Sequence, residues 1–405
     1  MIHIKPEQLE FLDWEFGLFF HFGIRTFHEG HTDWDGKPMP AEGFQPSALD
    51  CEDWVKAARD AGAAYCVFTC KHHDGFANWP SAFTEYSVKN APWKNGRGDV
   101  VREFTDACRK YGLKIGLYYS PAQFGSVKMN AKEYDDYFIA QITELLTNYG
   151  RIDYLWFDGC GSEGHNYDTV RIVREIRALQ PQILLFNMWD PDTRWIGNES
   201  GVADSPNPLV VDAVNFSVQT DKKDRLKTAK FLPAECDCRI REASWFFTDS
   251  DADTVKSLDE LMGLYYYSVG RGANLLLNVS PDRRGLLPER DKAALLRFGE
   301  EIQKLFADPI PCKTKQNGAV LTLSFDVQPV NHIILAEEIT GKDEIMSFTI
   351  KAFPHSYGAP ITVFRGTTVG HKAICPFPTI RTGRIEIGFD RKKNVDALAF
   401  YLPRF

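Results

Sequence analysis

The 405-residue chain has no long basic run and no long apolar run. Its formal charge is −8 and its longest basic run is the triplet 391–393, so a nucleic-acid or anionic-membrane partner is not expected. No apolar stretch approaches the roughly 20 residues that span a bilayer. The first residues do not resemble a signal peptide, and a secreted or periplasmic location is expected if such a peptide has been removed. What is left is ordinary globular composition, 44% hydrophobic and 25% charged.

Cysteine is present in an odd number, nine, and scattered along the chain. The nearest pair is Cys236-x-Cys238, and no second pair follows at a spacing that would complete a metal site. We therefore expect the cysteines to be mostly reduced, buried, small apolar residues. No metal and no cofactor are expected.

The first three quarters of the chain alternate short β-rich apolar runs with longer amphipathic segments. Strand alternating with helix predicts a parallel sheet, and the first run lacks a dinucleotide-binding fingerprint. An α/β fold with a (β/α)8 TIM-like barrel is therefore favoured. The expected strands are 16–22, 64–69, 114–119, 154–158, 182–187, 213–218, 244–248 and 274–279. The expected helices are 48–61, 100–111, 131–149, 167–179, 254–269 and 290–306.

The segment Asp308-Pro309-Ile310-Pro311 ends this pattern. Beyond it, short alternating strands follow one another without convincing helices, at 319–325, 332–336, 345–351, 361–364 and 384–387. That spacing predicts a C-terminal β-sandwich. Two domains are therefore expected, a catalytic barrel over residues 1–308 and a β-sandwich over residues 309–405.

Polar side chains recur where the first four expected strands end. These positions hold His21, then His72 and His73, then Tyr118-Tyr119, and then Asp158. In a parallel barrel the strand C-termini meet at one rim, where catalytic residues lie. The sequence therefore predicts an active site at this rim.

A carboxylate flanked by tryptophan and backed by neutral histidines and tyrosines suits a retaining glycosidase. Such enzymes need a nucleophilic carboxylate and a second carboxyl that protonates the leaving oxygen. A metal-dependent barrel hydrolase is an alternative, but adjacent His72 and His73 would point to opposite faces of a strand and chelate poorly. A catalytically inactive sugar-binding protein is a third, and candidates for both carboxylates argue against it.

Five segments in combination resemble glycoside hydrolase family 29, the α-L-fucosidases. They are 19–23 (FFHFG), 68–76 (FTCKHHDGF), 98–101 (GDVV), 116–121 (GLYYSP) and 156–159 (WFDG). The resemblance covers nearly the whole chain. It implies a (β/α)8-like barrel with a C-terminal β-sandwich, hydrolysis of terminal α-linked L-fucose with retention, and fucosylated oligosaccharides or glycoconjugates as substrates.

The resemblance also implies roles for single residues. Asp158 matches the nucleophile, and fucose-binding side chains match His21, His72, His73 and Tyr119. Trp34 or Trp79 is expected under the sugar ring, and Arg194 is expected to help hold the charge balance. Where relatives often carry Glu-Trp this chain has Asp33-Trp34, and Glu42 is an alternative to Asp33.

Two segments compete for the acid/base. Residues 194–201, with Glu199, resemble the branch that cleaves α-1,3- and α-1,4-linked fucose from branched, Lewis-type glycans, and so do residues 279–285. Residues 233–236, with Glu235, resemble the broad-specificity branch. Glu199 is the predicted acid/base and Glu235 a second site carboxylate. A salt bridge to Arg239 or Arg241 is the alternative for Glu235.

The C-terminal motif 366–371 (GTTVGH) resembles galactose-binding, jelly-roll-like modules attached to such enzymes. No aromatic platform is readable there, so a structural role is expected for this domain.

Overall fold

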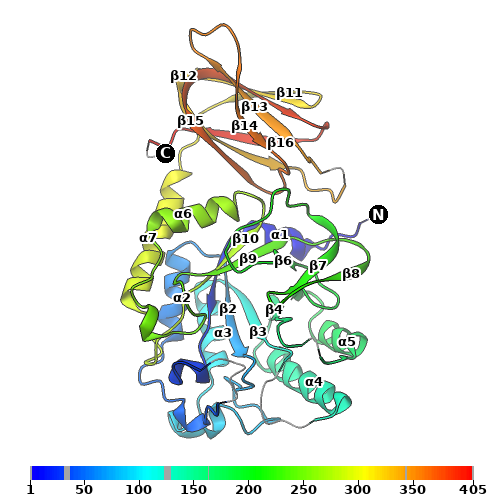
Figure 1. The fold of residues 1–405 in the computed structure, drawn as a ribbon, viewed down its shortest axis with the longest axis vertical. Coiled ribbons are helices and arrows are strands. Elements are labelled where there is room, and N and C mark those ends of the chain that lie inside the picture. Colours follow the sequence, from blue (N-terminus) through cyan, green and yellow to red (C-terminus); the bar gives the residue numbers. More distant parts are fainter. Residues whose placement is uncertain (1, 32–36, 123–128, 163, 343, 404–405) are drawn as a thin grey trace.

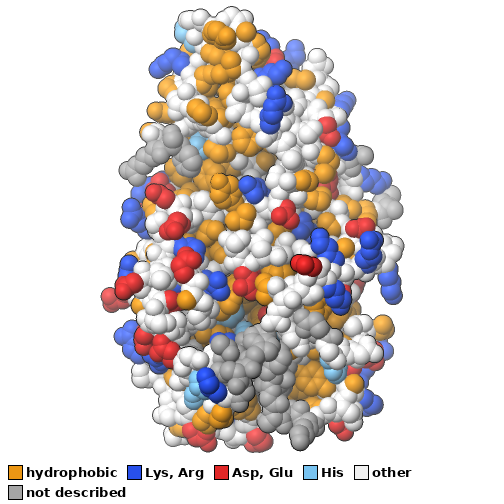
Figure 2. Space-filling view, viewed as in Figure 1, with side chains coloured by type: hydrophobic (Ala, Val, Ile, Leu, Met, Phe, Trp, Pro, Cys, Tyr) orange, Lys and Arg blue, Asp and Glu red, His pale blue; other side chains and the backbone are white. Residues whose placement is uncertain are grey.

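The computed structural model describes residues 2–31, 37–122, 129–162, 164–342 and 344–403. It has two parts, an α/β barrel and an antiparallel β domain. In Figure 1 the β domain lies above the barrel. Among the described residues, no helix combines the length and the apolar character needed to cross a membrane. On the face shown in Figure 2, acidic and basic side chains are interspersed.

Eight parallel strands form the barrel, in the order β5-β4-β3-β2-β1-β10-β9-β6. They are β1 (Phe16–Phe20), β2 (Tyr65–Lys71), β3 (Lys114–Tyr119), β4 (Tyr154–Phe157), β5 (Leu184–Phe186), β6 (Arg194–Trp195), β9 (Ala234–Arg239) and β10 (Asn274–Asn278). An isolated parallel bridge between Phe186 and Thr193 joins the two ends of this order. The sheet is therefore a nearly closed barrel, which confirms the predicted fold class.

Helices lie on both sides of the barrel and between it and the β domain (Figure 1). They are α1 (Pro6–Trp14), α2 (Cys51–Asp60), α3 (Val100–Tyr111), α4 (Ala131–Asn148), α5 (Thr169–Leu179), α6 (Leu258–Tyr267) and α7 (Glu289–Leu305). Short 3₁₀ helices are Ile24–Phe27, Ala41–Gly43, Val88–Asn90, Trp93–Gly96 and Asp249–Asp251. Five α-helices begin at a side chain that accepts a hydrogen bond from a first-turn N–H, the usual N-cap. These caps are Asp50, Asp99, Asn130, Asp168 and Ser257.

Two of the eight predicted barrel strands were wrong. Residues 213–218 overlap β7 (Val210–Ser217), which pairs antiparallel with β8 (Thr220–Phe231) as a separate hairpin, the β7–β8 hairpin. Residues 244–248 form no strand. The barrel uses β6 and β9 there, and residues 187–193, all described, contain no helix between β5 and β6. A two-residue strand is too short to show a periodic pattern, whereas β7 is eight residues long and rich in valine, which is typical of a strand.

The C-terminal β domain has its own apolar core. Its strands are β11 (Lys313–Asn317), β12 (Val320–Glu337), β13 (Phe348–Pro354), β14 (Ile361–Gly366), β15 (Ala373–Phe389) and β16 (Val395–Phe400). The long β12 pairs with β11 over its first part and with β16 over its last part, and register shifts interrupt its pairing with β15. The predicted boundary at residue 308 lies between the end of α7 and the start of β11.

The two parts touch along α6 and the loop that follows it. The Tyr266 hydroxyl lies 3.0 Å from Nε2 of the buried His332, and the backbone N–H of Ile374 donates to the Gly270 carbonyl at 3.0 Å. Lys372 forms an ion pair with Glu15, at the end of α1. The β domain therefore packs on the side of the barrel away from the carboxyl ends of its strands.

Candidate active site

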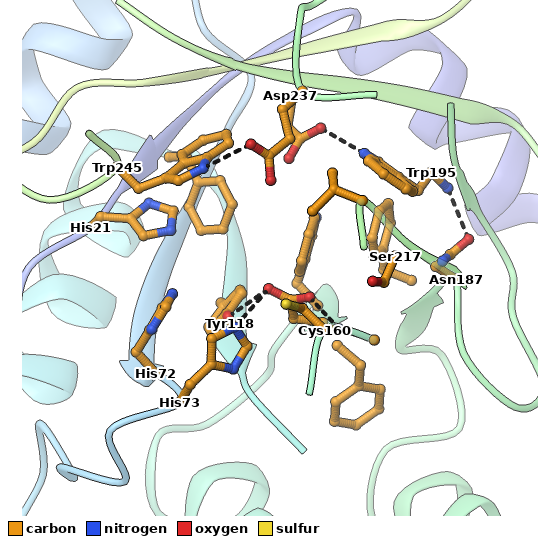
Figure 3. A pocket seen from close by; sticks show the side chains of 18 of the residues that line it. His21, His72, His73, Tyr118, Cys160, Asn187, Trp195, Ser217, Asp237 and Trp245 are labelled. Carbon is orange, nitrogen blue, oxygen red and sulfur yellow. Dashed lines mark hydrogen bonds and ion pairs between the residues drawn. The ribbon is translucent and has the colours of Figure 1, made fainter. Parts of the chain in front are cut away.

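A cavity of about 410 Å³ opens at the carboxyl ends of the barrel strands. Figure 3 shows its polar side chains, with His21, His72, His73 and Tyr118 on one side and Asp237 and Trp195 on the other. Its remaining lining comes from Phe19, Arg25, Trp156, Phe157, Asp158, Gly159, Cys160, Phe186, Asn187, Glu199, Phe216, Ser217, Val218, Gln219, Arg239, Ala243, Ser244 and Trp245. Aromatic walls with a few convergent polar groups are typical of a small-ligand site.

Asp158 follows the last residue of β4 and is held by groups that favour its charged form. Its Oδ2 accepts from the Tyr118 hydroxyl at 2.9 Å and lies 3.4 Å from His73 Nε2. Its Oδ1 accepts from the backbone N–H of Cys160 at 2.8 Å. Burial pushes the pKa of Asp158 upward, but His73 and the Cys160 N–H outweigh burial and leave this pKa below its ordinary value. Asp158 is therefore ionised at neutral pH, which the predicted role of nucleophile requires.

Three histidines lie beside this carboxylate. Nδ1 of His21 lies 2.8 Å from the Asn278 Oδ1, and burial, followed by the neighbouring His72, holds the pKa of His21 well below its ordinary value. The His72 ring stacks on Tyr118 at 5.4 Å between centroids. The neutral His21 ring can both donate and accept hydrogen bonds, which suits the binding of sugar hydroxyls.

Glu199 lies in the loop after β6 and enters the same cavity. Its Oε2 accepts from the Trp245 indole N–H at 3.1 Å and is 3.9 Å from the Arg239 guanidinium. Burial is the largest influence on the pKa of Glu199, the Asp158 charge adds to it, and together they raise this pKa above its ordinary value. Two carboxyl groups with pKa values displaced in opposite directions divide naturally into a base and an acid.

Asp237, on β9, is a second acidic group beside Glu199 that the sequence analysis missed. Its Oδ1 accepts from the Trp195 indole N–H at 2.7 Å, and its side chain is buried. Burial and then the Glu199 charge raise the pKa of Asp237 well above its ordinary value. The spacing of Glu235 and Asp237 could have indicated it. Two residues apart in one apolar strand, these acids face the same side of the strand.

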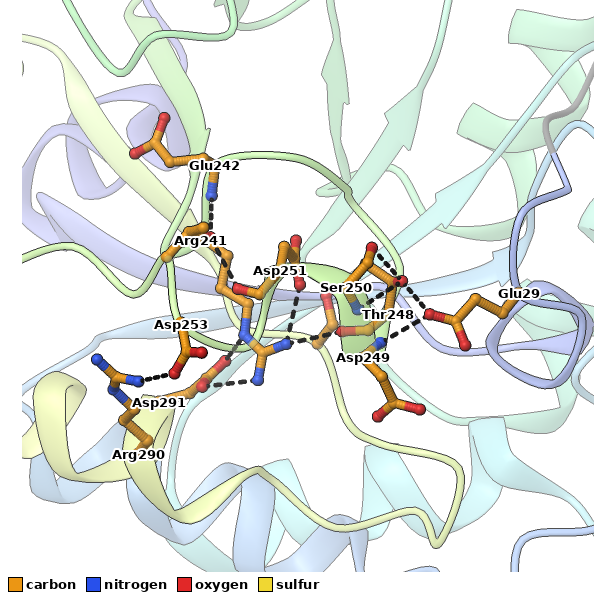
Figure 4. Close-up of polar contacts among 12 residues, drawn as sticks. Glu29, Arg241, Glu242, Thr248, Asp249, Ser250, Asp251, Asp253, Arg290 and Asp291 are labelled. Atoms are coloured by element: carbon orange, nitrogen blue, oxygen red, sulfur yellow. Dashed lines mark hydrogen bonds and ion pairs between the residues drawn. The ribbon is translucent and has the colours of Figure 1, made fainter.

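The loop that carries Trp245 is fixed by a buried ion cluster (Figure 4). Arg241 donates to both carboxylate oxygens of Asp291 at 2.7 and 2.9 Å and to Asp251 at 3.0 Å. Glu29, from the segment after β1, accepts from the Asp249 backbone N–H at 2.9 Å. These contacts fix the loop, and the loop holds the Trp245 indole that donates to Glu199.

Tyr119 was predicted to contact the sugar, and the structure places it outside the site. Its hydroxyl donates to the Gln141 side chain of α4 at 2.6 Å, in the core between barrel and helix. Tyr118 lines the cavity instead. Successive strand residues face opposite sides, so a one-residue difference exchanges the two environments.

Trp79 and Arg194 also lie away from the cavity. The Trp79 indole donates to Glu144 of α4 at 2.9 Å. The Arg194 guanidinium donates to the Pro208 carbonyl at 3.1 Å and lines a different cavity, between β6 and the β7–β8 hairpin. The next residue, Trp195, is the one that faces the site.

Glu235 lies in the barrel interior and not in the cavity. It accepts from the hydroxyls of Tyr65 at 2.6 Å and Tyr154 at 3.3 Å and from the Trp156 indole at 2.8 Å. The proposed alternative, a salt bridge to Arg239 or Arg241, is not formed either: among the described contacts, these arginines pair with other acids. Burial raises the pKa of Glu235 to about 7.

Asp33 and Trp34 lie outside the described residues. Glu42 is exposed on the 3₁₀ helix Ala41–Gly43 and is not part of the cavity lining.

The tip of the β7–β8 hairpin is a further wall that sequence reasoning missed. Residues 216–219 line the cavity, and Phe216 comes close to Gly159, the residue after Asp158. A Cβ on Gly159 would lie 2.3 Å from the Phe216 carbonyl oxygen, so only glycine permits this approach. No pattern in the hairpin sequence indicates this contact.

Comparisons with known proteins agree with this geometry. A sequence model of the α-L-fucosidase family matches residues 3–304. The chain is 32% identical to α-L-fucosidase 1 of Arabidopsis thaliana, over 97% of this chain and 87% of that protein. It is 26% identical to the tissue α-L-fucosidase of Rattus norvegicus, over 74% of this chain and 69% of that protein. The crystal structure of a glycoside hydrolase 29 family member from an unknown rumen bacterium superposes with a TM-score of 0.89 at 31% identity, over 99% of this chain and 78% of that one. With the cavity and its carboxylates, these matches place the chain in the α-L-fucosidases of glycoside hydrolase family 29.

Proposed function

We propose that this α-L-fucosidase releases terminal α-linked L-fucose by double displacement, with Asp158 as nucleophile and Glu199 as acid/base. One observation carries the assignment. Asp158 and Glu199 line the same cavity, and their pKa values are displaced in opposite directions. A retaining glycosidase needs this pair, an ionised carboxylate and a protonated carboxyl.

In the first step Asp158 attacks the anomeric carbon of fucose. The bond from that carbon to the leaving oxygen breaks, and the Glu199 proton moves to that oxygen. In the second step water attacks the same carbon, Glu199 takes the proton from this water, and the bond to Asp158 breaks. Two inversions leave fucose with its original α configuration.

The hydroxyls of fucose are bound on the histidine side of the cavity. His21, His72 and His73 line that side, together with Tyr118. Trp245, held near Glu199, offers an aromatic face close to the reacting bond. A cavity of about 410 Å³ is suited to one terminal sugar and the start of the next.

For the substrate we propose fucose linked α-1,3 or α-1,4 on branched, Lewis-type glycans. Support comes from Glu199, whose segment resembles that branch of the family and whose carboxyl enters the cavity. The broad-specificity alternative needs Glu235 at the reacting bond, and its carboxyl is enclosed by two tyrosines and a tryptophan in the barrel interior.

A proton NMR time course tests the reaction. With a Lewis trisaccharide as substrate, we expect α-fucose to appear before mutarotation produces β-fucose. The Asp158→Ala variant is the control and should release no fucose above background. Early β-fucose would exclude Asp158 as a covalent nucleophile, and release only from α-1,2-linked fucose would overturn the linkage assignment.

A further inference from the structure

Three side chains of different chemistry converge beside the nucleophile. They are His73, just beyond β2, Asp158, and Cys160, two residues further on. Their ligand atoms all lie within 4.8 Å of one another. All three line the cavity, and Figure 3 labels His73 and Cys160 among its side chains. One nitrogen, one oxygen and one sulfur thus surround a point that is open to the cavity.

The hydrogen bonds around His73 indicate which ring nitrogen carries the proton. The Ser120 hydroxyl donates to the Ala122 carbonyl at 3.0 Å, so its oxygen accepts from His73 Nδ1–H, which lies 2.5 Å away. The other ring nitrogen, Nε2, faces the nucleophile and lies 3.4 Å from Asp158 Oδ2. A cation that binds here takes the place of the contact between this nitrogen and the carboxylate, and both atoms become its ligands.

Two of the three donors, Asp158 and His73, are oriented in advance by hydrogen bonds. The backbone N–H of Cys160 holds Asp158 Oδ1 at 2.8 Å, which fixes the carboxylate plane. A second hydrogen bond on the far nitrogen of a histidine is the usual support of a metal ligand, and Ser120 supplies it here.

The donor set selects the class of metal. Imidazole nitrogen, thiolate sulfur and carboxylate oxygen together suit Zn²⁺, and its soft analogue Cd²⁺, better than Mg²⁺ or Ca²⁺, which prefer oxygen ligands. Three protein ligands with a fourth position open to solvent are the common arrangement of an accessible zinc site. Binding releases the Cys160 thiol proton to solvent, and no electron is transferred.

We propose that Zn²⁺ binds reversibly to His73, Asp158 and Cys160 and inhibits the enzyme by occupying its nucleophile. The binding rests on the donor geometry alone. The inhibition rests in addition on the proposed role of Asp158 in catalysis.

Cd²⁺ titration of the full chain tests the binding without any turnover. Coordination by a thiolate gives an ultraviolet charge-transfer absorption, which the wild-type chain should show at one equivalent of metal. The Cys160→Ser and Cys160→Ala variants should lose it. The matched control is Cys312→Ser, because Cys312 is the one cysteine that is not buried and lies in the C-terminal part of the chain. Absence of the absorption in the wild-type chain, or its persistence in both Cys160 variants, would overturn the site.

Inhibition by buffered Zn²⁺ tests the consequence, with each variant compared to its own metal-free rate. Wild-type activity should fall as Zn²⁺ rises and return when EDTA is added. Removal of the thiolate should weaken the inhibition about tenfold or more, whereas Cys312→Ser should leave it unchanged. Cd²⁺ binding through Cys160 without loss of activity would uphold the metal site and contradict the role of Asp158 as nucleophile. Inhibition of equal strength in the Cys160 variants would overturn the inhibitory site.

Discussion

At the scale of single residues, Asp158 and Glu199 differ in what surrounds their carboxyl oxygens. Asp158 receives hydrogen bonds from Tyr118 and from a backbone N–H, which stabilise its charge. Glu199 receives one, from Trp245, and burial favours its neutral form. The proposed roles of nucleophile and acid/base therefore follow from the different surroundings of two chemically similar groups.

This difference predicts a bell-shaped dependence of kcat/KM on pH. Activity should fall at low pH as Asp158 is protonated, below its ordinary pKa, because that pKa is lowered. It should fall at high pH as Glu199 loses its proton, above its ordinary pKa, because that pKa is raised. In Glu199→Gln, measured on an aryl fucoside whose leaving group needs no protonation, the alkaline limb should disappear. An unchanged alkaline limb would assign it to another group.

Tyr118 and Tyr119 form a matched pair for a second prediction. Tyr118→Phe removes a hydrogen bond to a charged group, worth roughly 1.5–3 kcal/mol, and should lower kcat/KM about 10- to 100-fold. Tyr119→Phe removes a buried bond to Gln141 and should cost about 1 kcal/mol of stability with kcat nearly unchanged. Steady-state kinetics and urea unfolding of both variants check this. The reverse pattern would restore Tyr119 to the site.

The sequence located the strand ends but not which of two neighbouring residues faces inward. His21, His72, His73, Asp158 and Glu199 were assigned from motifs, and the structure brings all five to one cavity. Tyr119 was assigned by resemblance to the family, and Tyr118 precedes it in the same apolar run. Which of the two side chains points into the barrel is decided by the register of β3 against its neighbouring strands. The sequence of one strand does not reveal that register.

At the scale of elements, β9 carries two acids on one face at different depths. Asp237, nearer the strand end, reaches the cavity, and Glu235 stays in the interior with Tyr65 and Trp156. Glu235 therefore connects β9 to β2 and β4 across the barrel. Its role is in the stability of the barrel.

Glu235 should make stability depend on pH. Its pKa in the folded chain is about 7, above the value of 4.5 expected for an unfolded chain, so the folded state binds the proton more tightly. The contribution of Glu235 to the unfolding free energy is therefore fully present below about pH 4.5 and is lost as pH rises through about 7, on the order of 1 kcal/mol per pKa unit. Urea unfolding of Glu235→Gln should show a flatter profile in this window, and the exposed Glu300→Gln should not. An equally steep profile in Glu235→Gln would assign the dependence elsewhere.

The elements that the sequence missed share a physical cause. The two residues of β6 are held in the barrel by pairing with β9, a tertiary contact, and carry no pattern of their own. In the sequence, β7 resembles a barrel strand because it is a short run rich in apolar residues, and its last residues are buried like those of a barrel strand. By contrast α2 to α5 were located from their amphipathic pattern, to within a few residues at each end.

At the scale of the whole molecule, the β domain buries part of the barrel surface through α6. His332 on β12 meets Tyr266 on α6, with Asn331 at its other ring nitrogen. The interface therefore includes a buried histidine that contacts a tyrosine and an asparagine.

This histidine predicts acid lability. Burial lowers the pKa of His332 to about 4, below the value of about 6.5 in an unfolded chain, so protonation favours unfolding. Its contribution to stability is present above about pH 6.5 and is lost as pH falls through about 4. The His332→Gln variant should show a weaker loss of stability over this window in urea unfolding, and the exposed His3→Gln variant should behave as the wild type. An unaltered loss in His332→Gln would place the acid sensitivity elsewhere.

The β7–β8 hairpin has a consequence for how such an enzyme diversifies. Its two strands pair with each other and not with the eight barrel strands, yet its tip forms one wall of the cavity against Gly159. Insertions, deletions or exchange of this segment can therefore alter which glycans reach the nucleophile while the barrel hydrogen bonds stay intact. The substrate range can therefore change through replacement of the β7–β8 hairpin, while the residues at the strand ends of the barrel stay the same.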